Sequence, residues 1–403
     1  MAAALTLVLV ACSGTGDDSA TSSSSTSSST AAAGSTATTP ATVGSGDVAA
    51  LAEAFAATLD EDQVSALNQD YTFANAANWS NFPNALLTGA AAGGGTGGGR
   101  PSGDMTGTPP AGMTAPSGTM TGTAGGAGGM SGSTGRVGLQ TGSLTDEQWT
   151  ALEALLAAAT GSAADEGFDE IMQHLAADDY LTDNGGGEEY GRTNFFIAFL
   201  GTPTTTGTWE LQFGGHHLAL ANTYTDGALA AATPSFRGIE PMTTVEEDGT
   251  TVEPEQQEQA AFAALLASLD TTQTTTATLT QSFNDILLGP GEDWAFPTTA
   301  EGIKGSDLST QQQELLLAAI NTYVDDISDA DAATILAGYR SELDETYLSF
   351  TGSTTMTEEG DYLRIDGPSV WIEFSMQHGI VLDGAHPHAV WRDKTTDYAG
   401  LTS

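Results

Sequence analysis

Residues 193–224 read TNFFIAFLGTPTTTGTWELQFGGHHLALANTY, and this stretch decides the fold class. It contains three apolar runs, at 193–200, 208–213 and 216–224, separated by Gly201-Thr202-Pro203 and Gly214-Gly215. Short runs rich in aromatic and β-branched residues and bounded by Gly and Pro are typical of β-strands. The stretch therefore predicts a first cluster of strands.

A second cluster of strands is predicted near the C-terminus, at 362–365, 370–376 and 389–392. Apolar residues at helical spacing predict helices at 47–67, 145–160, 165–180, 254–283, 309–326 and 329–346. Ser143-Leu144-Thr145-Asp146-Glu147-Gln148 has the capping residue and acids of a helix start. We predict an α+β fold of roughly 300 ordered residues, in which helices flank one largely antiparallel sheet built from both clusters.

The first twelve residues predict a lipoprotein signal peptide. Residues 2–11 are apolar and end in Leu9-Val10-Ala11 before Cys12. The run is shorter than the about 20 residues of a membrane-spanning helix and matches the apolar region of a signal peptide. We expect a lipid on Cys12, the only cysteine of the chain, so no intrachain disulfide is possible. The expected location is the cell envelope, on the outer membrane or cell surface.

Two low-complexity segments divide the rest of the chain. Residues 13–46 are almost entirely Ser, Thr, Ala and Gly, and residues 88–135 are rich in Gly, Thr, Pro and Met. Such segments bury too little apolar surface to offset the entropy of ordering, so we expect a disordered tether and a disordered insertion. Residues 47–403 then form a single domain interrupted by the insertion.

The charge of the chain restricts its partners. Fifty-two acidic residues against nine basic ones give a net charge of −43 and a pI near 4.1. A phosphate backbone would be repelled, so nucleic-acid binding is excluded at the level of the sequence. An anionic membrane surface would also be repelled, which leaves the lipid as the expected membrane anchor. Strong acidity is most simply a means of solvation in salty surroundings.

Four of the six histidines fall in two clusters, His216-His217 and His386 with His388. Residues two apart on a strand share one face, so His386 and His388 can face one site. Of the adjacent pair, only one should face that site unless Gly214-Gly215 introduces a bulge. A hairpin over 375–384 would bring Glu373 near the imidazoles.

This set predicts a transition-metal site. Two or three imidazoles (His386, His388 and His217 or His216) with the Glu373 carboxylate suit Zn²⁺, Cu²⁺ or Fe²⁺. Asp393 and Asp397 would orient the imidazoles, and Arg392 would bind an anionic group of a substrate.

Structural roles explain the same residues without a metal. One histidine of the adjacent pair would be in the core and one on the surface, Arg392 would pair with Asp393, and Pro387 would end an edge strand. The other histidines, His174 and His378, are expected at the surface.

Several stretches resemble the bacterial domain-of-unknown-function family 3500. They are WELQFGGHHLAL at 209–220, TPSF at 233–236, GPSVWIEF at 367–374, HPHAVWRD at 386–393 and Asp397-Tyr398. The resemblance covers the chain from Asp47 onward apart from the insertion, with Ala399 as a small departure from the pattern. It implies an exported protein and carries no established activity.

Three functions remain open from the sequence. The first is an extracytoplasmic metalloprotein, a metal-dependent hydrolase or oxidase acting on a small molecule. The second is a non-catalytic surface lipoprotein that binds a ligand in a cleft lined by Trp209, Trp371 and Trp391, or that stores copper. Copper is suggested by Met105, Met113, Met120 and Met130 of the insertion, because thioethers favour Cu(I). The third is a structural role at the envelope.

Overall fold

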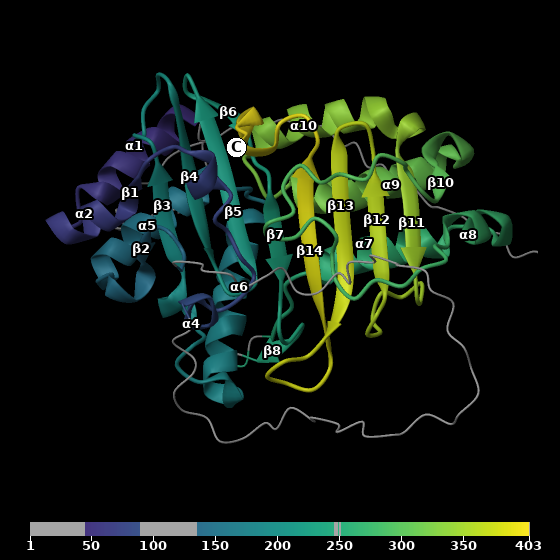
Figure 1. Ribbon diagram of the computed structural model, residues 1–403, viewed down its shortest axis with the longest axis horizontal. Helices are drawn as coiled ribbons and strands as arrows, with labels where there is room; N and C mark the ends of the chain where they lie inside the picture. Colours follow the sequence, from purple (N-terminus) through teal and green to yellow (C-terminus); the bar gives the residue numbers. More distant parts are fainter. Residues whose placement is uncertain (1–44, 89–134, 246–248, 250, 403) are drawn as a thin grey trace, which may run out of the picture. The chain divides into compact units, whose positions relative to one another are not determined.

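The strands of both clusters lie in one sheet of twelve strands (Figure 1) in the computed structural model, which describes residues 45–88, 135–245, 249 and 251–402. The main path of the sheet is β1-β3-β4-β5-β7-β14-β13-β12-β11-β10, with β2 paired to β3 and β6 paired to β5. All of these pairs are antiparallel except β1 with β3. The predicted α+β fold with one largely antiparallel sheet is confirmed.

The strands have the following bounds: β1 Asn68–Gln69, β2 Leu139–Gln140, β3 Phe196–Leu200, β4 Thr208–Gly215, β5 Leu218–Thr225, β6 Ala228–Ala231, β7 Ser235–Gly238, β10 Ile303–Lys304, β11 Tyr347–Thr351, β12 Tyr362–Asp366, β13 Val370–His378 and β14 Ala385–Asp393. A separate two-stranded sheet pairs β8 Thr244–Val245 with β9 Thr251–Val252. The α-helices are α1 Ser45–Ala56, α2 Glu61–Leu67, α3 Phe73–Ala76, α4 Asn84–Thr88, α5 Asp146–Ala159, α6 Gly167–Leu181, α7 Gln256–Ala267, α8 Thr271–Ala277, α9 Thr310–Val324 and α10 Asp329–Glu342.

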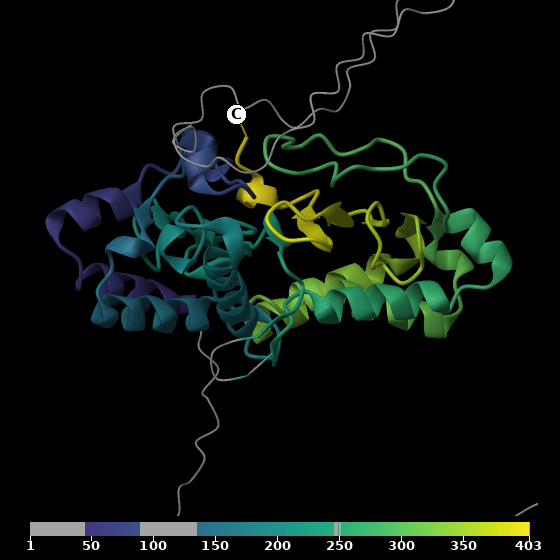
Figure 2. The same ribbon diagram turned by 90° about the horizontal axis from the view of Figure 1, so that it is seen from below.

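The two faces of the sheet are covered differently (Figure 2). The long helices pack on one face, where alternate strand residues such as Ile372, Phe374 and Trp391 join side chains of α7, α9 and α10 in the larger core. The opposite face is covered mainly by irregular chain. There Phe283 stacks on Tyr362, with ring centroids 4.0 Å apart. This second face holds the candidate site.

The domain contains one arrangement twice. In each half two helices (α1 and α2, α7 and α8) are followed by a short strand (β2, β10), a second pair of helices (α5 and α6, α9 and α10) and a set of antiparallel strands. The first half has β1, α3 and α4 in addition, between α2 and β2. Capping boxes begin α5 and α9, with Gln148 and Gln312 at the third helical position. Each of these glutamines exchanges amide hydrogen bonds with the glutamine of another capping box, Gln148 with Gln63 and Gln312 with Gln273. Local sequence thus sets the same helix junction in both halves.

Most expected elements are found, with three differences. The expected helix at 47–67 is two helices, because Asp60 caps a new one at Glu61. The expected helix at 254–283 likewise ends at Ala277, after a break before Asp270. Strands β6, β7 and β11 and the two-residue strands were not predicted from the sequence.

Several sequence predictions lie outside the described residues. Cys12, the four methionines of the insertion and nearly all of the expected tether and insertion belong to 1–44 and 89–134. Among the residues that the structure describes, no helix has the length and apolar character needed to cross a membrane.

The junction between the helix pairs gives a test of the fold. Oε1 of Gln312 accepts a hydrogen bond from the backbone N of Ser309 at 2.9 Å, and its Nε2 donates to the backbone O of Ser268 at 2.8 Å. We expect Gln312→Ala to lower the free energy of unfolding by about 1–2 kcal/mol, because the capping box is lost and these partly buried backbone groups lose their partners. The exposed neighbour Gln311 is the control, and Gln311→Ala should change the free energy of unfolding by less than about 0.5 kcal/mol. Equal effects in urea unfolding would contradict the role given to Gln312.

Candidate metal centre

The His216-His217 pair forms the tip of a β-hairpin. Gly215 ends β4 and pairs with Leu218, which begins β5, so the two histidines are the whole turn. His217 has a φ of +60°, a backbone angle that residues other than Gly adopt uncommonly. Non-glycine residues held in such conformations cluster at functional sites. The expected strand over 216–224 therefore begins two residues later, and its first two residues are the turn.

His386 and His388 lie on β14 and point to the face covered by irregular chain. Their partners across β13 are Gln377 and Ser375, and side chains alternate along a strand, so the two imidazoles share a face. Strand β14 lies between β13 and β7 in the middle of the sheet. Pro387 therefore does not end an edge strand.

His217, His386 and His388 come together as a triangle. The three pairs of ring centroids are each 5.1 Å apart. Nε2 of His217 lies 3.2 Å from Nε2 of His388, and each residue offers a ring nitrogen within 4.8 Å of those of the other two. Two nitrogens that bind one tetrahedral Zn²⁺ at about 2.0–2.1 Å are about 3.3 Å apart, with ring centroids about 5 Å apart. The triangle has these dimensions.

The rings of His217 and His386 are buried and held neutral. Nδ1 of His217 and both ring nitrogens of His386 are buried without a hydrogen-bond partner. Burial, with the neighbouring imidazoles adding to it, lowers the pKa of His386 to about 3 and that of His217 well below its usual range. Metal ions bind the neutral imidazole. The site thus holds His217 and His386 in the form that binds a metal.

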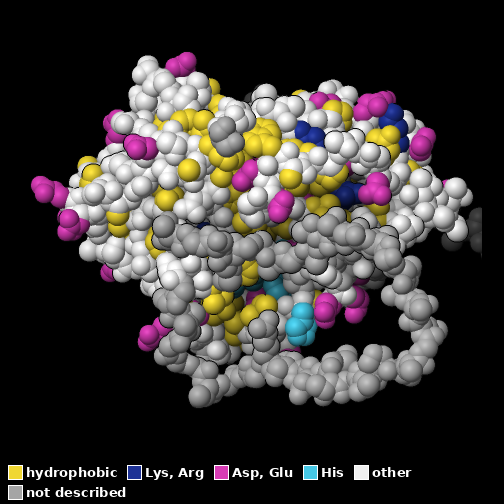
Figure 3. Space-filling view, in the orientation of Figure 1, with side chains coloured by type: hydrophobic (Ala, Val, Ile, Leu, Met, Phe, Trp, Pro, Cys, Tyr) yellow, Lys and Arg dark blue, Asp and Glu magenta, His cyan; other side chains and the backbone are white. Residues whose placement is uncertain are grey.

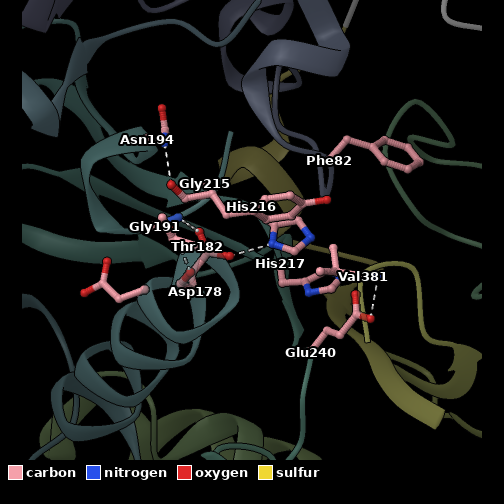
Figure 4. A network of polar contacts seen from close by, with 12 residues as sticks. Phe82, Asp178, Thr182, Gly191, Asn194, Gly215, His216, His217, Glu240 and Val381 are labelled. Atoms are coloured by element: carbon pink, nitrogen blue, oxygen red, sulfur yellow. Dashed lines mark hydrogen bonds and ion pairs between the residues drawn. The ribbon is translucent and has the colours of Figure 1, made fainter. Parts of the chain in front are cut away.

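Two aspartates orient the histidines. Nδ1 of His388 lies 3.0 Å from Oδ1 of Asp285, the contact by which a carboxylate fixes the ring of a metal-binding histidine. Nδ1 of His216 lies 2.6 Å from Oδ1 of Asp178 on α6 (Figure 4). The ring of His216 stacks on His217 with centroids 3.8 Å apart. His216 is thus held against the triangle and is not part of it.

Gly238 on β7 makes room for two of the rings. A Cβ at this position would lie 3.1 Å from Cδ2 of His388 and 3.3 Å from Cδ2 of His217, and 2.8 Å from the carbonyl O of Pro387. Backbone hydrogen bonds from His217 to Asn81 and from Gly238 to His217 fix the turn beside β7. No pattern in the sequence marks Gly238, Asp285 or Asp178 as neighbours of the histidines.

Glu373 does not join the histidines, contrary to our expectation. It pairs with Val390, two residues from His388 on the same face, yet its carboxylate turns away from them. Oε1 accepts hydrogen bonds from Tyr362 and the backbone N of Leu287, and Oε2 accepts from the Trp371 indole and the backbone N of Leu288. Glu373 is completely buried, and its carboxylate joins the covering chain at Leu287 and Leu288 to the sheet.

Asp393, Asp397 and Arg392 also have other roles than those expected. Oδ2 of Asp393 accepts from Tyr339, and Asp397 receives Nε of Arg392 at 2.7 Å. Arg392 is completely buried, and its other contacts are Asp293 at 3.0 Å and the carbonyl of Leu288. Arg392 and Asp397 are completely buried and Asp393 is 7% exposed, and these hydrogen bonds go to groups other than the histidines. Arg392 forms structural ion pairs with Asp397 and Asp293, and not with Asp393.

The three tryptophans do not line one cleft. Trp209 is in the smaller core under the helices, and Trp371 is buried on the opposite face of the sheet. Trp391 lines a cleft of about 260 Å³ beside α10, together with Leu229, Tyr339 and Asp331. The side chain of Trp391 points to the helix-covered face, so this cleft and the histidine triangle lie on opposite faces of the sheet.

The remaining two histidines differ from each other. His378 is exposed, with 72% of its side chain in solvent, as expected. His174 was expected at the surface but is 1% exposed on α6. The missed signal is its spacing, because Glu166, Glu170 and His174 recur every four residues and so share one face of a helix.

Comparison with known proteins places the chain in a family. Residues 131–400 match the family described as "Protein of unknown function (DUF3500)". The match covers more than half of the chain, and the protein therefore belongs to this family, which confirms the resemblance of its motifs. Searches of curated proteins and of solved structures give no match.

The buried imidazoles predict a dependence of stability on pH. The folded-state pKa of His386 is about 3, below its unfolded value of about 6.5. As the pH falls from 7 to 4, the His386 imidazole binds a proton in the unfolded state but not in the folded state. The free energy of unfolding that this neutral imidazole contributes at pH 7 is therefore lost. In metal-free protein the free energy of unfolding should therefore fall more steeply over this range in the wild type than in His386→Gln. Parallel curves from urea unfolding would refute the assignment.

Proposed function

We propose that the protein is an extracytoplasmic lipoprotein whose folded domain binds one transition-metal ion through His217, His386 and His388. The observation that carries this proposal is the triangle of imidazoles with 5.1 Å between each pair of ring centroids. Both ring nitrogens of His386 have no hydrogen-bond partner, and Nε2 of His217 and Nε2 of His388 face each other at 3.2 Å, so a metal ion would satisfy one nitrogen of each ring. The ligand set consists of three imidazole nitrogens, which suits Zn²⁺, Cu²⁺ or Fe²⁺.

The proposed activity is that of a metal-dependent hydrolase acting on a small molecule. Three protein ligands leave a fourth position for water, which is the arrangement of catalytic rather than structural zinc sites. A bound divalent metal lowers the pKa of that water and so supplies hydroxide at neutral pH. The protein would hold the imidazoles through Asp285 and through the stacked His216 ring. Histidines exposed by at most 8% favour a small substrate.

The alternative is a non-catalytic lipoprotein that handles copper or binds a ligand. Three imidazoles and no carboxylate form a ligand set that also accepts copper. The cleft beside Trp391 offers a separate place for a small ligand. An oxidase would use the same triangle with a redox-active metal.

Metal analysis of the full chain, purified without a histidine tag, tests the site. We expect about one Zn, Cu or Fe ion per chain bound by imidazoles, and loss of this ion in His386→Ala and in His388→Ala. His378→Ala is the matched control, because it removes an exposed imidazole and should leave the metal content unchanged. Wild-type protein that takes up none of these metals after supplementation would contradict the proposal.

The identity of the metal separates the two functions. Zinc with hydrolysis of small ester or phosphate substrates, lost in His388→Ala, supports the hydrolase. Copper whose binding also depends on Met105, Met113, Met120 and Met130 supports the copper-handling alternative.

The anchor is tested by Cys12→Ser. In the host cell we expect the wild type in the membrane fraction and labelled by a fatty acid, because lipidation is its proposed attachment. The variant should lose the label and leave the membrane fraction. An unlabelled wild type in the soluble fraction would contradict the lipoprotein assignment.

A further inference from the structure

A second group of metal-binding side chains lies on the other side of strand β7. Arg237 and Gly238 are neighbours on this strand, so their side chains point to opposite faces. Gly238 faces the histidine triangle. Arg237 points into the helix-covered side, where its Nε lies 2.7 Å from Glu170 and its Nη2 lies 2.6 Å from Asp326.

Five carboxylates and one imidazole meet around Arg237. Glu166, Glu170 and His174 come from one face of α6, Glu255 and Glu258 from the start of α7, and Asp326 from the end of α9. Two overlapping triads have ligand atoms within 4.8 Å of one another: Glu170, His174 and Glu255 form one, and Glu166, Glu170 and Asp326 form the other. Glu170 belongs to both triads and is therefore placed to bridge them.

Several of these polar atoms have no hydrogen-bond partner although they are buried. They include both carboxylate oxygens of Glu255 and of Glu258, each residue being 0% exposed, and Oε1 of Glu170. Nε2 of His174, 1% exposed, is likewise unpartnered and lies 3.7 Å from Oε1 of Glu255. Buried polar groups normally find a partner in protein or solvent. An imidazole nitrogen aimed at unpartnered carboxylates therefore points to a ligand at this position.

The charge of the group points to the same ligand. Arg237 supplies one positive charge, so four of the five carboxylates have no cationic side chain to balance them. Burial and mutual repulsion raise the pKa of Glu166 to about 10 and that of Glu258 well above its usual range. Without further cations the group must take up protons. Two divalent cations would balance four carboxylates and release those protons.

We propose that this group is a carboxylate-rich metal centre for Mn²⁺ or Fe²⁺, with two overlapping sets of ligands that share Glu170 and could hold two ions. Carboxylate oxygens favour Mn²⁺ over softer metals, and a single imidazole is compatible with both Mn²⁺ and Fe²⁺. Carboxylates and histidine from several helices are also the ligand type of dinuclear iron and manganese centres in proteins. The site is separate from the histidine triangle and does not depend on the function proposed for it.

The experiment uses full-length protein that carries His386→Gln and His388→Gln, so that the triangle cannot contribute. The protein is refolded with Mn²⁺ or with a chelator, because a buried centre exchanges ions slowly once folded. We expect one to two Mn²⁺ ions per chain after dialysis and a higher Tm than in the chelator. The EPR signal of bound Mn²⁺ should differ from that of the aquo ion.

Glu258→Gln and Glu253→Gln form the matched pair of variants. Both remove one acid from the same segment, but Glu258 is buried and Glu253 is exposed. Glu258→Gln should lower the bound Mn²⁺ and abolish most of the gain in Tm, while Glu253→Gln should leave both unchanged. In the chelator Glu258→Gln should be at least as stable as its parent, because a neutral amide replaces a buried acid, so a folding defect is not mistaken for loss of the site.

The outcomes separate the two centres. A parent that refolds equally well with and without Mn²⁺ and retains none would overturn this proposal and would show protonated carboxylates in a structural role. It would leave the histidine site untouched, since that site is tested by Zn, Cu or Fe in protein with an intact triangle. Retained Mn²⁺ that is insensitive to Glu258→Gln would equally overturn the assignment.

Discussion

The antiparallel pairing of β7 with β14 is the constraint on which the rest of the structure depends. Only four residue pairs join these strands, from His388 with Gly238 to Trp391 with Ser235, yet they unite the strands of both halves in one sheet. The pairing sets His388 beside the His217 turn and places Arg237 opposite Ala389. A shift of one residue would exchange the faces of every side chain on a strand. Such a shift would move Arg237 away from its carboxylates and Gly238 away from the histidine rings at the same time.

The basic residues are few and many of them are used inside the protein. Arg237, Arg364 and Arg392 are at most 1% exposed, in a chain with only nine basic residues. Arg392 is neutralised by Asp397 and Asp293, and Arg364 by Glu301. The surface is left to acidic side chains, which dominate the charged groups visible in Figure 3. Arg237 differs from the other two, because it faces more carboxylates than it can balance.

The fold could be predicted from the sequence further than the site could. Capping residues such as Thr145 and the apolar runs around Trp209 specify elements through local contacts, and the structure forms them. The spacing of His386 and His388 correctly gave a shared face, because strand periodicity is local. The orientation of the Glu373 carboxylate depends instead on the hydrogen-bond donors that surround it, Tyr362 and Trp371 among them. Asp285 and Gly238 reach the histidines only through tertiary packing, for which the sequence has no local signal.

The repeated helix junction has a consequence for how such a chain arises. Two units of the same topology that meet edge to edge are what a symmetric dimer with an isologous strand contact becomes when its subunits are fused. In a homodimer each substitution appears in both subunits, so the two sides of the strand contact must carry the same residues. Fusion removes that restriction. The histidine turn at 216–217 has no counterpart in the second half, where Asp366 and Val370 flank the corresponding β12–β13 turn. Each half could thereby acquire residues of its own, and the triangle takes His217 from the first half and His386 and His388 from the second.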